Sequence, residues 1–137
     1  MTAGASWALQ KSVYQTLIAD AALTNLIGGP RVFDDVPGNA AFPFLTIGHD
    51  TTRDNATFSE TGFEHAIAVH VWSRASGRGE LKQIAAAVIA ALHDAPLVLE
   101  DNRLVNLRFQ SSVALKDPDG HTYHGIVRFR AVTEPGI

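Results

Sequence analysis

The sequence predicts an α+β fold, in which an antiparallel-rich sheet ending in a long C-terminal hairpin carries two main helices on one face. Two segments, residues 6–19 and 80–93, place apolar side chains at helical spacing. Three others, residues 63–73, 103–115 and 121–133, alternate apolar and polar side chains as half-buried strands do. Each of these apolar faces must be buried, so the order helix, strands, helix, hairpin favours one layered core.

The composition fits one domain over residues 1–137. Of these residues 46% are hydrophobic and 18% are charged, a balance that excludes a disordered chain. The net charge is −3, whereas proteins that bind nucleic acid tightly usually have an excess of basic residues. The chain has no cysteine, which excludes disulfides and thiolate chemistry. No stretch reaches the roughly 18 to 20 apolar residues of a membrane span. We therefore expect no membrane partner and no signal peptide.

The N-terminal third is expected to be helical and then to turn. Residues 6–19 form the first helix, with Ser6 as the expected N-cap and Trp7 among the apolar positions. A second, short helical turn is expected over residues 20–27. The run Gly28-Gly29-Pro30 ends it, because glycine permits left-handed geometry and proline blocks continuation.

Two shorter strands and a polar tip are expected next. Residues 31–36 and 44–49 favour strands, and the turn-forming run Pro37-Gly38-Asn39 separates them. Residues 50–61 are polar and indicate a long hairpin tip. Such a tip is either an interaction loop or a simple solvated excursion, and the sequence leaves both interpretations open.

The strand over residues 63–73 and the helix over residues 80–93 show the clearest patterns. In the strand, one face is expected to be apolar and buried, made by Phe63, Ile67, Val69 and Val71. The opposite face is expected to hold Glu64, Ala66, Ala68, His70 and an exposed Trp72. The helix repeats apolar residues at i, i+3 and i+4 spacing. These residues are Leu81, Ile84, Ala85, Val88, Ile89 and Leu92.

The last two strands form the long hairpin around the turn sequence Asp117-Pro118-Asp119-Gly120. In the first of them alternation predicts one shared apolar face, made by Val105, Leu107, Phe109, Val113 and Leu115. The outer face of the sheet is expected to be polar or aromatic. Its members are Trp72, Arg108, Gln110, His124, Arg128 and Arg130.

The search for catalytic or metal-binding motifs finds none that is convincing. His121 and His124 are three apart on a strand, so they point to opposite faces, and no acidic third ligand follows at a motif spacing. The other histidines, at positions 49, 65, 70 and 93, are interpreted as satisfied polar or interface residues. There is no G-x-S-x-G nucleophile elbow. We expect no enzymatic activity, no cofactor and no metal.

Charged side chains give weaker signals. The glycines around Arg78 lack the Walker lysine and the longer Rossmann spacing, so a flexible connection to the following helix is favoured. The adjacent acids at positions 34–35 and 100–101 project apart and indicate turn and surface residues. Arg108, Arg128 and Arg130 are expected on one side of the sheet. Both a phosphate contact and a solvated strand face explain that patch.

The ordered pattern as a whole resembles the tail terminator, or tail completion, family of tailed phages and phage-derived gene transfer agents. The residues that carry the resemblance are a first helix followed by glycine and Arg-Val-Phe at 31–33, Phe-Pro-Phe-Leu-Thr-Ile-Gly at 42–48, Val-His-Val-Trp-Ser at 69–73, and an amphipathic helix ending at Leu92. Each motif is structural apolar patterning. Their order and spacing, across most of the chain, carry the identification.

The resemblance implies a structural subunit of a ring, usually hexameric, that ends growth of the tail tube. Its partners would be other copies of itself, the major tail tube protein and a head-side connector or stopper, with DNA passing only in transit through the lumen. It would lie at the head-proximal end of the tail of a virion or phage-like particle assembled in the bacterial cytoplasm. The family supplies no catalytic residues.

Ring assembly requires that one patch of a protomer meet a different patch of the next. The candidate interface residues are Arg53, Asp54, Asn55, Trp72, Arg108, Arg128 and Arg130. Two other functions remain open. One is another head–tail component, such as a connector stopper or a tube subunit, and the other is a small-ligand enzyme or binding module on an unrelated α+β sheet.

Overall fold

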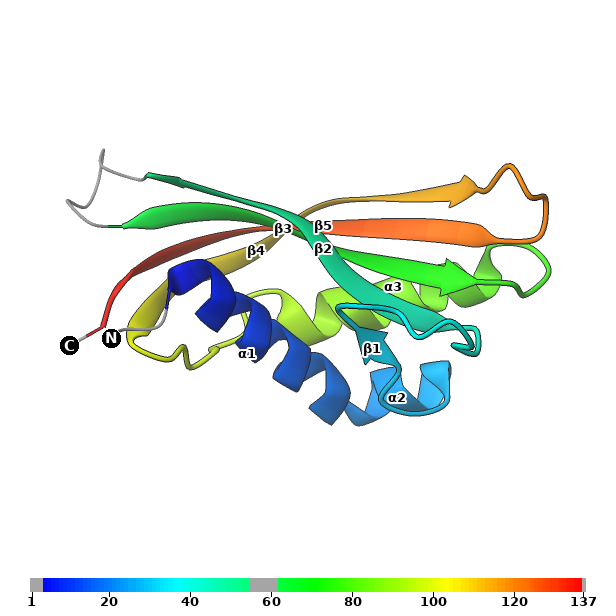
Figure 1. Ribbon diagram of the computed structural model, residues 1–137, viewed down its shortest axis with the longest axis horizontal. Helices are drawn as coiled ribbons and strands as arrows, with labels where there is room; N and C mark the ends of the chain where they lie inside the picture. The colour runs from blue at the N-terminus through cyan, green and yellow to red at the C-terminus, as the bar shows by residue number, and fades with distance from the viewer. Residues whose placement is uncertain (1–3, 55–61, 137) are drawn as a thin grey trace.

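The computed structural model describes residues 4–54 and 62–136, which form three helices and one five-stranded sheet (Figure 1). The helices are α1 (Ala5–Ala19), α2 (Ala21–Ile27) and α3 (Gly79–Leu92). The strands are β1 (Val32–Phe33), β2 (Phe44–Asp54), β3 (Phe63–Ser73), β4 (Asn102–Lys116) and β5 (Tyr123–Pro135). The predicted α+β class is confirmed. Every helix in this described part is too short or too polar to cross a lipid bilayer.

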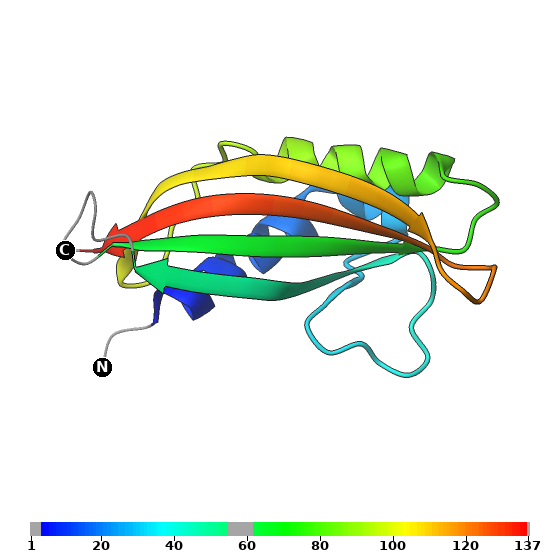
Figure 2. The same ribbon diagram turned by 90° about the horizontal axis from the view of Figure 1, so that it is seen from above.

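The sheet has the order β1-β2-β3-β5-β4, and only the short β1–β2 pair is parallel. Figure 2 shows β4 along one edge of the sheet and β2 toward the other, with the segment that follows β1 lying beyond β2. All three helices lie on the same side of the sheet (Figure 1). The predicted antiparallel-rich sheet with a C-terminal hairpin is therefore correct.

The core lies between this helix layer and the inner face of the sheet. Val69 of β3 and Val127 of β5 are directly opposite each other and fully buried, and Phe129 is 1% exposed. Leu17 of α1 and Ile84 of α3 are also fully buried in the same cluster. Burial of such side chains is the main favourable term in folding.

The buried face of helix α1 does not include its two aromatic residues, Trp7 and Tyr14. Ala8, Leu9, Val13 and Leu17 are at most 1% exposed, whereas Trp7 is 55% exposed. Residues four apart share a helix face, so Trp7 lies on a second stripe that the sheet does not cover. The prediction that Trp7 belongs to the core side is wrong.

The two helix starts differ in their capping. Gly4, and not Ser6, is the N-cap of α1, since Ser6 is already helical and its hydroxyl donates to Asp50 Oδ2 at 3.1 Å. At α2 the Asp20 carboxylate accepts the backbone N–H of Leu23 at 2.9 Å, a capping bond that fits the predicted start. Gly28 then ends α2 with a φ of 83°, as the glycine pattern predicts.

Helix α3 follows its predicted pattern. Leu81, Ile84, Val88 and Leu92 are all buried, while Ala85 and Ile89 pack at the margin of the core. Its start is tied to the end of β3 by the Ser73 hydroxyl, which donates to Glu80 Oε1 at 2.7 Å. Its first turn lies close against β5. A Cβ added to Gly125 would stand 3.0 Å from a methyl carbon of Leu81, so only glycine fits there without a shift.

The β1–β2 region differs from the prediction in two ways. The strand expected over residues 31–36 is reduced to Val32 and Phe33, and β2 continues through Asp54 instead of ending near His49. A bulge between Gly48 and Thr51 lets the polar residues 51–54 keep pairing with β3. Residues 51–54 are polar and were expected in the hairpin tip, but their backbone groups pair with β3 and make them part of the strand. Residues 55–61, the rest of that predicted tip, lie outside the described residues.

Strand β4 does not keep one apolar face, because two bulges interrupt its pairing with β5. The register shifts between Leu104 and Asn106 and again between Phe109 and Ser111. Each extra residue reverses the side to which the following side chains point. Leu107 stays on the inner face with 1% exposure, whereas Leu115 lies opposite His124 and is 45% exposed. The second bulge also turns Val113 outward, and Val105 is the exposed extra residue of the first bulge, so the predicted shared face is wrong.

Two leucine substitutions on β4 test this register. Leu107→Ala should lower the free energy of unfolding by about 2–5 kcal/mol, because a fully packed side chain leaves a cavity. Leu115→Ala should lower it by less than about 1 kcal/mol, since the outer face is half open to solvent. Denaturant unfolding of both variants measures the difference. Equal losses would show that the two leucines share a buried face.

Candidate assembly surface

The face of the sheet opposite the helices is called here the open face. Side chains paired in register project to the same side, so the register of β2, β3, β5 and β4 defines its members. Two shallow hollows of about 780 and 720 Å³ lie on it, and Arg128 lines both. The residues whose side chains lie on the open face include Phe44, Thr46, Arg53, Glu64, His70, Trp72, Arg108, Val113, Leu115, His124, Arg128 and Arg130.

Three rings on β3 and β5 form a stack at one end of the open face. The Trp72 indole and the His124 imidazole are nearly parallel, with an interplanar angle of 9° and centroids 3.8 Å apart. His70 Nδ1 lies 2.7 Å from His124 Nε2, and the Trp72 ring N–H donates to Thr46 Oγ1 at 3.1 Å. Phe44 extends the row on the other side of Trp72, with centroids 6.3 Å apart. We call Phe44, Trp72, His124 and His70 the aromatic stack.

The aromatic stack keeps its histidines neutral. Burial lowers the pKa of His70 to about 4, with smaller contributions from neighbouring His124, His49 and Arg128. Burial also lowers the pKa of His124, against the opposing charge of Asp117. A hydrogen bond between two neutral imidazoles requires one nitrogen to donate and the other to accept. The stack therefore adds stacked rings, and no positive charge, to the open face at neutral pH.

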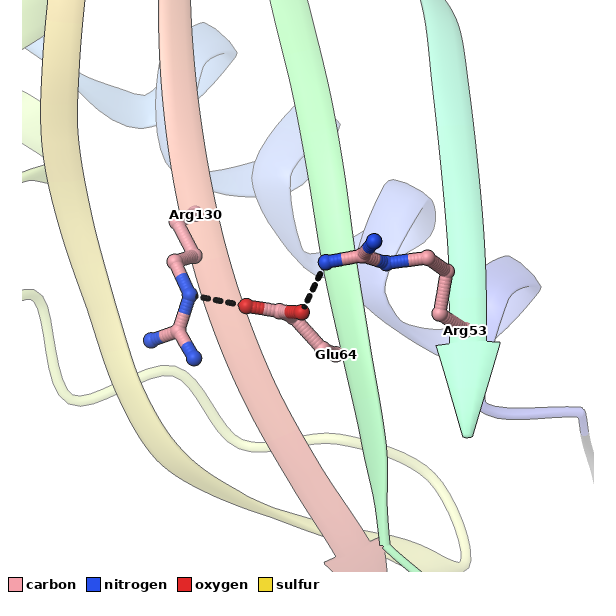
Figure 3. Close-up of polar contacts among 3 residues, drawn as sticks. All are labelled: Arg53, Glu64 and Arg130. Carbon is pink, nitrogen blue, oxygen red and sulfur yellow. Dashed lines mark hydrogen bonds and ion pairs between the residues drawn. The ribbon is translucent and has the colours of Figure 1, made fainter. Parts of the chain in front are cut away.

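A three-residue ion-pair network occupies the other end of the open face. Figure 3 shows the Glu64 carboxylate between the guanidinium groups of Arg53 and Arg130, which come from β2 and β5 on either side of β3. Arg53 Nη2 lies 2.6 Å from Glu64 Oε1, and Arg130 Nε donates to Glu64 Oε2. Hydrogen bonds from Arg53 and then Arg130 lower the pKa of Glu64. One carboxylate thus ties three adjacent strands together across their outer side.

The residue types on the open face are typical of protein interfaces. The open face offers stacked rings, partly exposed apolar side chains and guanidinium groups, which are the residue types enriched at protein interfaces. In residues 4–54 and 62–136 no three His, Asp or Glu side chains lie together as a set that could hold a metal ion. His124, which the sequence pattern did not support as a metal ligand together with His121, contacts His70.

The comparison with known proteins decides the family. Residues 11–134 match the family described as Tail completion protein gp17. This chain belongs to that family. The tail completion protein gp17 of Bacillus phage SPP1 is 29% identical over 126 residues, which cover 92% of each chain. The resemblance found in the sequence motifs is therefore confirmed.

Solved structures agree with this membership. A chain of the virion of a native gene transfer agent particle superposes with a TM-score of 0.87 at 35% identity, covering 94% of this chain and 96% of that one. The structure of bacteriophage SPP1 gp17 superposes with a TM-score of 0.61 at 29% identity, covering 93% and 89%. The similarity extends across nearly the whole layered fold of this tail completion family member.

The structure brings three of the predicted interface residues of this family member into the ion-pair network or the aromatic stack of the open face. Arg53 and Arg130 meet through Glu64, with 74% and 41% of their side chains exposed. Trp72 is half-buried in the aromatic stack, whereas the alternation predicted an exposed ring. Because the stack covers one face of the indole, only part of the ring remains available to a partner.

The remaining predicted residues are more scattered. Arg108 is directly opposite Arg130, and 62% of its side chain is exposed. Arg128 is exposed and pairs with no carboxylate among the described residues. Asp54 ends β2, opposite Phe63, and Asn55 lies outside the described residues. Whether these side chains contact a partner stays a prediction.

Sequence reasoning missed the two contacts that organise this surface. Glu64 and His70 were expected on the outer side of β3, but their partners come from β5, 66 and 54 residues away. Alternation gives the side to which a residue points and not the neighbouring strand. His65 was interpreted as a satisfied polar histidine, and this is confirmed. It is 2% exposed between Thr52 at 3.1 Å and Thr133 at 2.9 Å.

Glu64→Gln should destabilise the protein in a pH-dependent way. The folded pKa of Glu64 is lowered, so its stabilising effect is fully present above the ordinary value of 4.5 and is lost as pH falls below it. The free energy of unfolding of the variant should therefore lie below that of the parent at pH 7. The gap should narrow at pH 3, as measured by denaturant titration. An equal gap at both pH values would contradict the network.

His70 should make stability fall on mild acidification. Its folded pKa of about 4 lies below the ordinary 6.5, so the folded state is favoured fully above pH 6.5 and progressively less as pH drops toward 4. His70→Gln should flatten this part of the stability curve. An NMR titration of the His70 ring checks the cause directly. A midpoint near 6.5 would show that the ring is solvated instead of stacked.

Proposed function

We propose that this protein is the subunit of a ring, hexameric as in the family it resembles, that completes the tail of a phage-type particle. The observation that carries the proposal is the near full-length match to a chain of a gene transfer agent virion. Membership in the tail completion family supports the same role. The described residues serve this role as a rigid scaffold, and the proposal requires no catalysis from them.

In this proposal the ring sits at the head-proximal end of the tail. It caps the last layer of the major tail tube protein, which ends tube growth, and it presents its other side to the head-side connector or stopper. DNA passes through the lumen in transit. The net charge of −3 is compatible with passage, because a strongly basic lumen would hold the phosphate backbone.

The open face is proposed as one of the surfaces that contact these particle proteins. Exposed Arg53, Arg108 and Arg128 supply hydrogen-bond donors in a planar geometry suited to carboxylates of a partner. Val113 and Leu115, which the β4 bulges turn outward, supply apolar area. This combination is typical of an interface whose core is apolar and whose rim is polar.

Removal of the protein from an assembling particle tests the proposed role. We expect tails of irregular length that fail to join heads, visible by electron microscopy, because nothing would stop tube polymerisation. Restoring the chain in trans should restore uniform, joined tails. Tails of normal, uniform length attached to heads in its absence would overturn the proposal.

Light scattering of the purified protein tests the ring itself. Measured alone and mixed with its cognate tail tube protein, the mass should reach that of about six protomers in at least one of the two conditions. A monomer that ignores the tube protein at all concentrations would favour a stopper-type or ligand-binding role instead.

A further inference from the structure

Two grooves lie at opposite edges of the sheet, and they differ in charge and in side-chain size. One, of about 300 Å³, lies between α1 and β1 and is lined by Trp7, Tyr14, Phe33, Asp34 and Asp35. We call it the acidic groove. The other, of about 540 Å³, lies between α3 and β4 and is lined by Arg78, Lys82, Ala85, Ala86, Val113 and Ala114. We call it the basic groove.

The acidic groove exposes large rings beside uncompensated negative charge. Trp7 is 55% exposed and Tyr14 is 38% exposed, on the stripe of α1 that the sheet leaves uncovered. Asp34 and Asp35 are exposed and form no ion pair within residues 4–54 and 62–136. Lys11, the cation of this groove, is held by Glu100 at 2.5 Å and so does not neutralise them.

The basic groove has the opposite character. Alanines at positions 85, 86 and 114 leave room between α3 and β4, and Val113 is 38% exposed beside them. Arg78 and Lys82 lie one helical turn apart at the start of α3. In the part of the chain that the structure describes, neither of these cations pairs with a carboxylate. The groove thus combines small side chains with positive charge.

Position relates the two grooves to ring assembly. The acidic groove is lined by residues of α1 and β1, and β1 is the strand at one edge of the sheet. The basic groove is lined by residues of α3 and β4, and β4 is the strand at the other edge. A ring of identical subunits needs two different complementary patches, so that each protomer binds its neighbour head to tail. Two patches on opposite lateral edges meet this requirement, whereas two patches on one face would not propagate around a ring.

We propose that the acidic groove of one protomer binds the basic groove of the next. Trp7 and Tyr14 would fill the space above the alanines, and Asp34 and Asp35 would face Arg78 and Lys82. Buried aromatic side chains in such pockets carry much of the binding energy at interfaces, and complementary charge sets the register. This assignment rests on the proposed ring, and names the surfaces that close it.

Charge reversal tests the pairing. Asp34→Lys with Asp35→Lys reverses the charge of the acidic groove and of the neighbouring open-face hollow, which both aspartates also line, whereas Arg78→Glu with Lys82→Glu alters the basic groove. Each double variant alone should lose the ring, with the protomer concentration for half-assembly raised at least about tenfold, because like charges would meet at every contact. Mass is measured by light scattering, with tube protein present if the parent ring requires it.

An equimolar mixture of the two double variants should recover the ring. In an alternating ring each altered groove meets an altered partner and each unaltered groove an unaltered one, so opposite charges face each other at every contact. The matched controls keep the charge: Asp34→Glu with Asp35→Glu, and Arg78→Lys with Lys82→Arg, should both assemble. Thermal unfolding followed by circular dichroism confirms that every variant is folded.

The outcomes separate this inference from the proposed function. If the parent protein forms no ring alone or on the tube protein, the ring fails, and the groove pairing fails with it. If the parent forms a ring and the reversed variants assemble equally well, the groove pairing is wrong while the ring stands. Loss of the ring in both variants without recovery in the mixture would also show that the two grooves do not face each other.

Discussion

Burial of a single face of the sheet against α1 and α3 is the constraint on which the rest of the structure depends. Val69, Val127 and Phe129 are at most 1% exposed on that inner face. Most apolar side chains of β3 and β5 point to that inner face, so the outer positions of these two strands hold polar, charged and aromatic residues. The open face is thus a direct result of one-sided packing.

Charge on the open face is compensated only in part. Glu64 holds two guanidinium groups, and the low pKa of His70 keeps an uncharged ring in the aromatic stack at neutral pH. Exposed ion pairs contribute little to stability individually, and this network joins side chains of three adjacent strands. The open face therefore keeps positive charge, because Arg128 is exposed and pairs with no carboxylate among the described residues, although the whole chain has a net charge of −3.

The two edges of the sheet differ because different helices cover them. Helix α3 lies along the β4 edge and leaves a groove of small side chains and cations, while α1 meets β1 and leaves rings and carboxylates. A protomer with unlike edges is suited to head-to-tail association, and one with like edges would favour a closed dimer. The asymmetry begins in the order of elements along the chain, which places the short β1 and the long β4 at opposite ends of the sheet.

The sequence by itself determined the α+β class, the faces of β3 and the buried stripe of α3, because a period of 2.0 or 3.6 records which side of an isolated element is apolar. The order of the sequence motifs also indicated the protein family. The sequence did not reveal the bulges that turn Val113 and Leu115 outward, since a bulge depends on the partner strand. Nor did it reveal the exposure of Trp7 or the contacts of Glu64 and His70. Those features depend on which elements become neighbours, and only tertiary packing decides that.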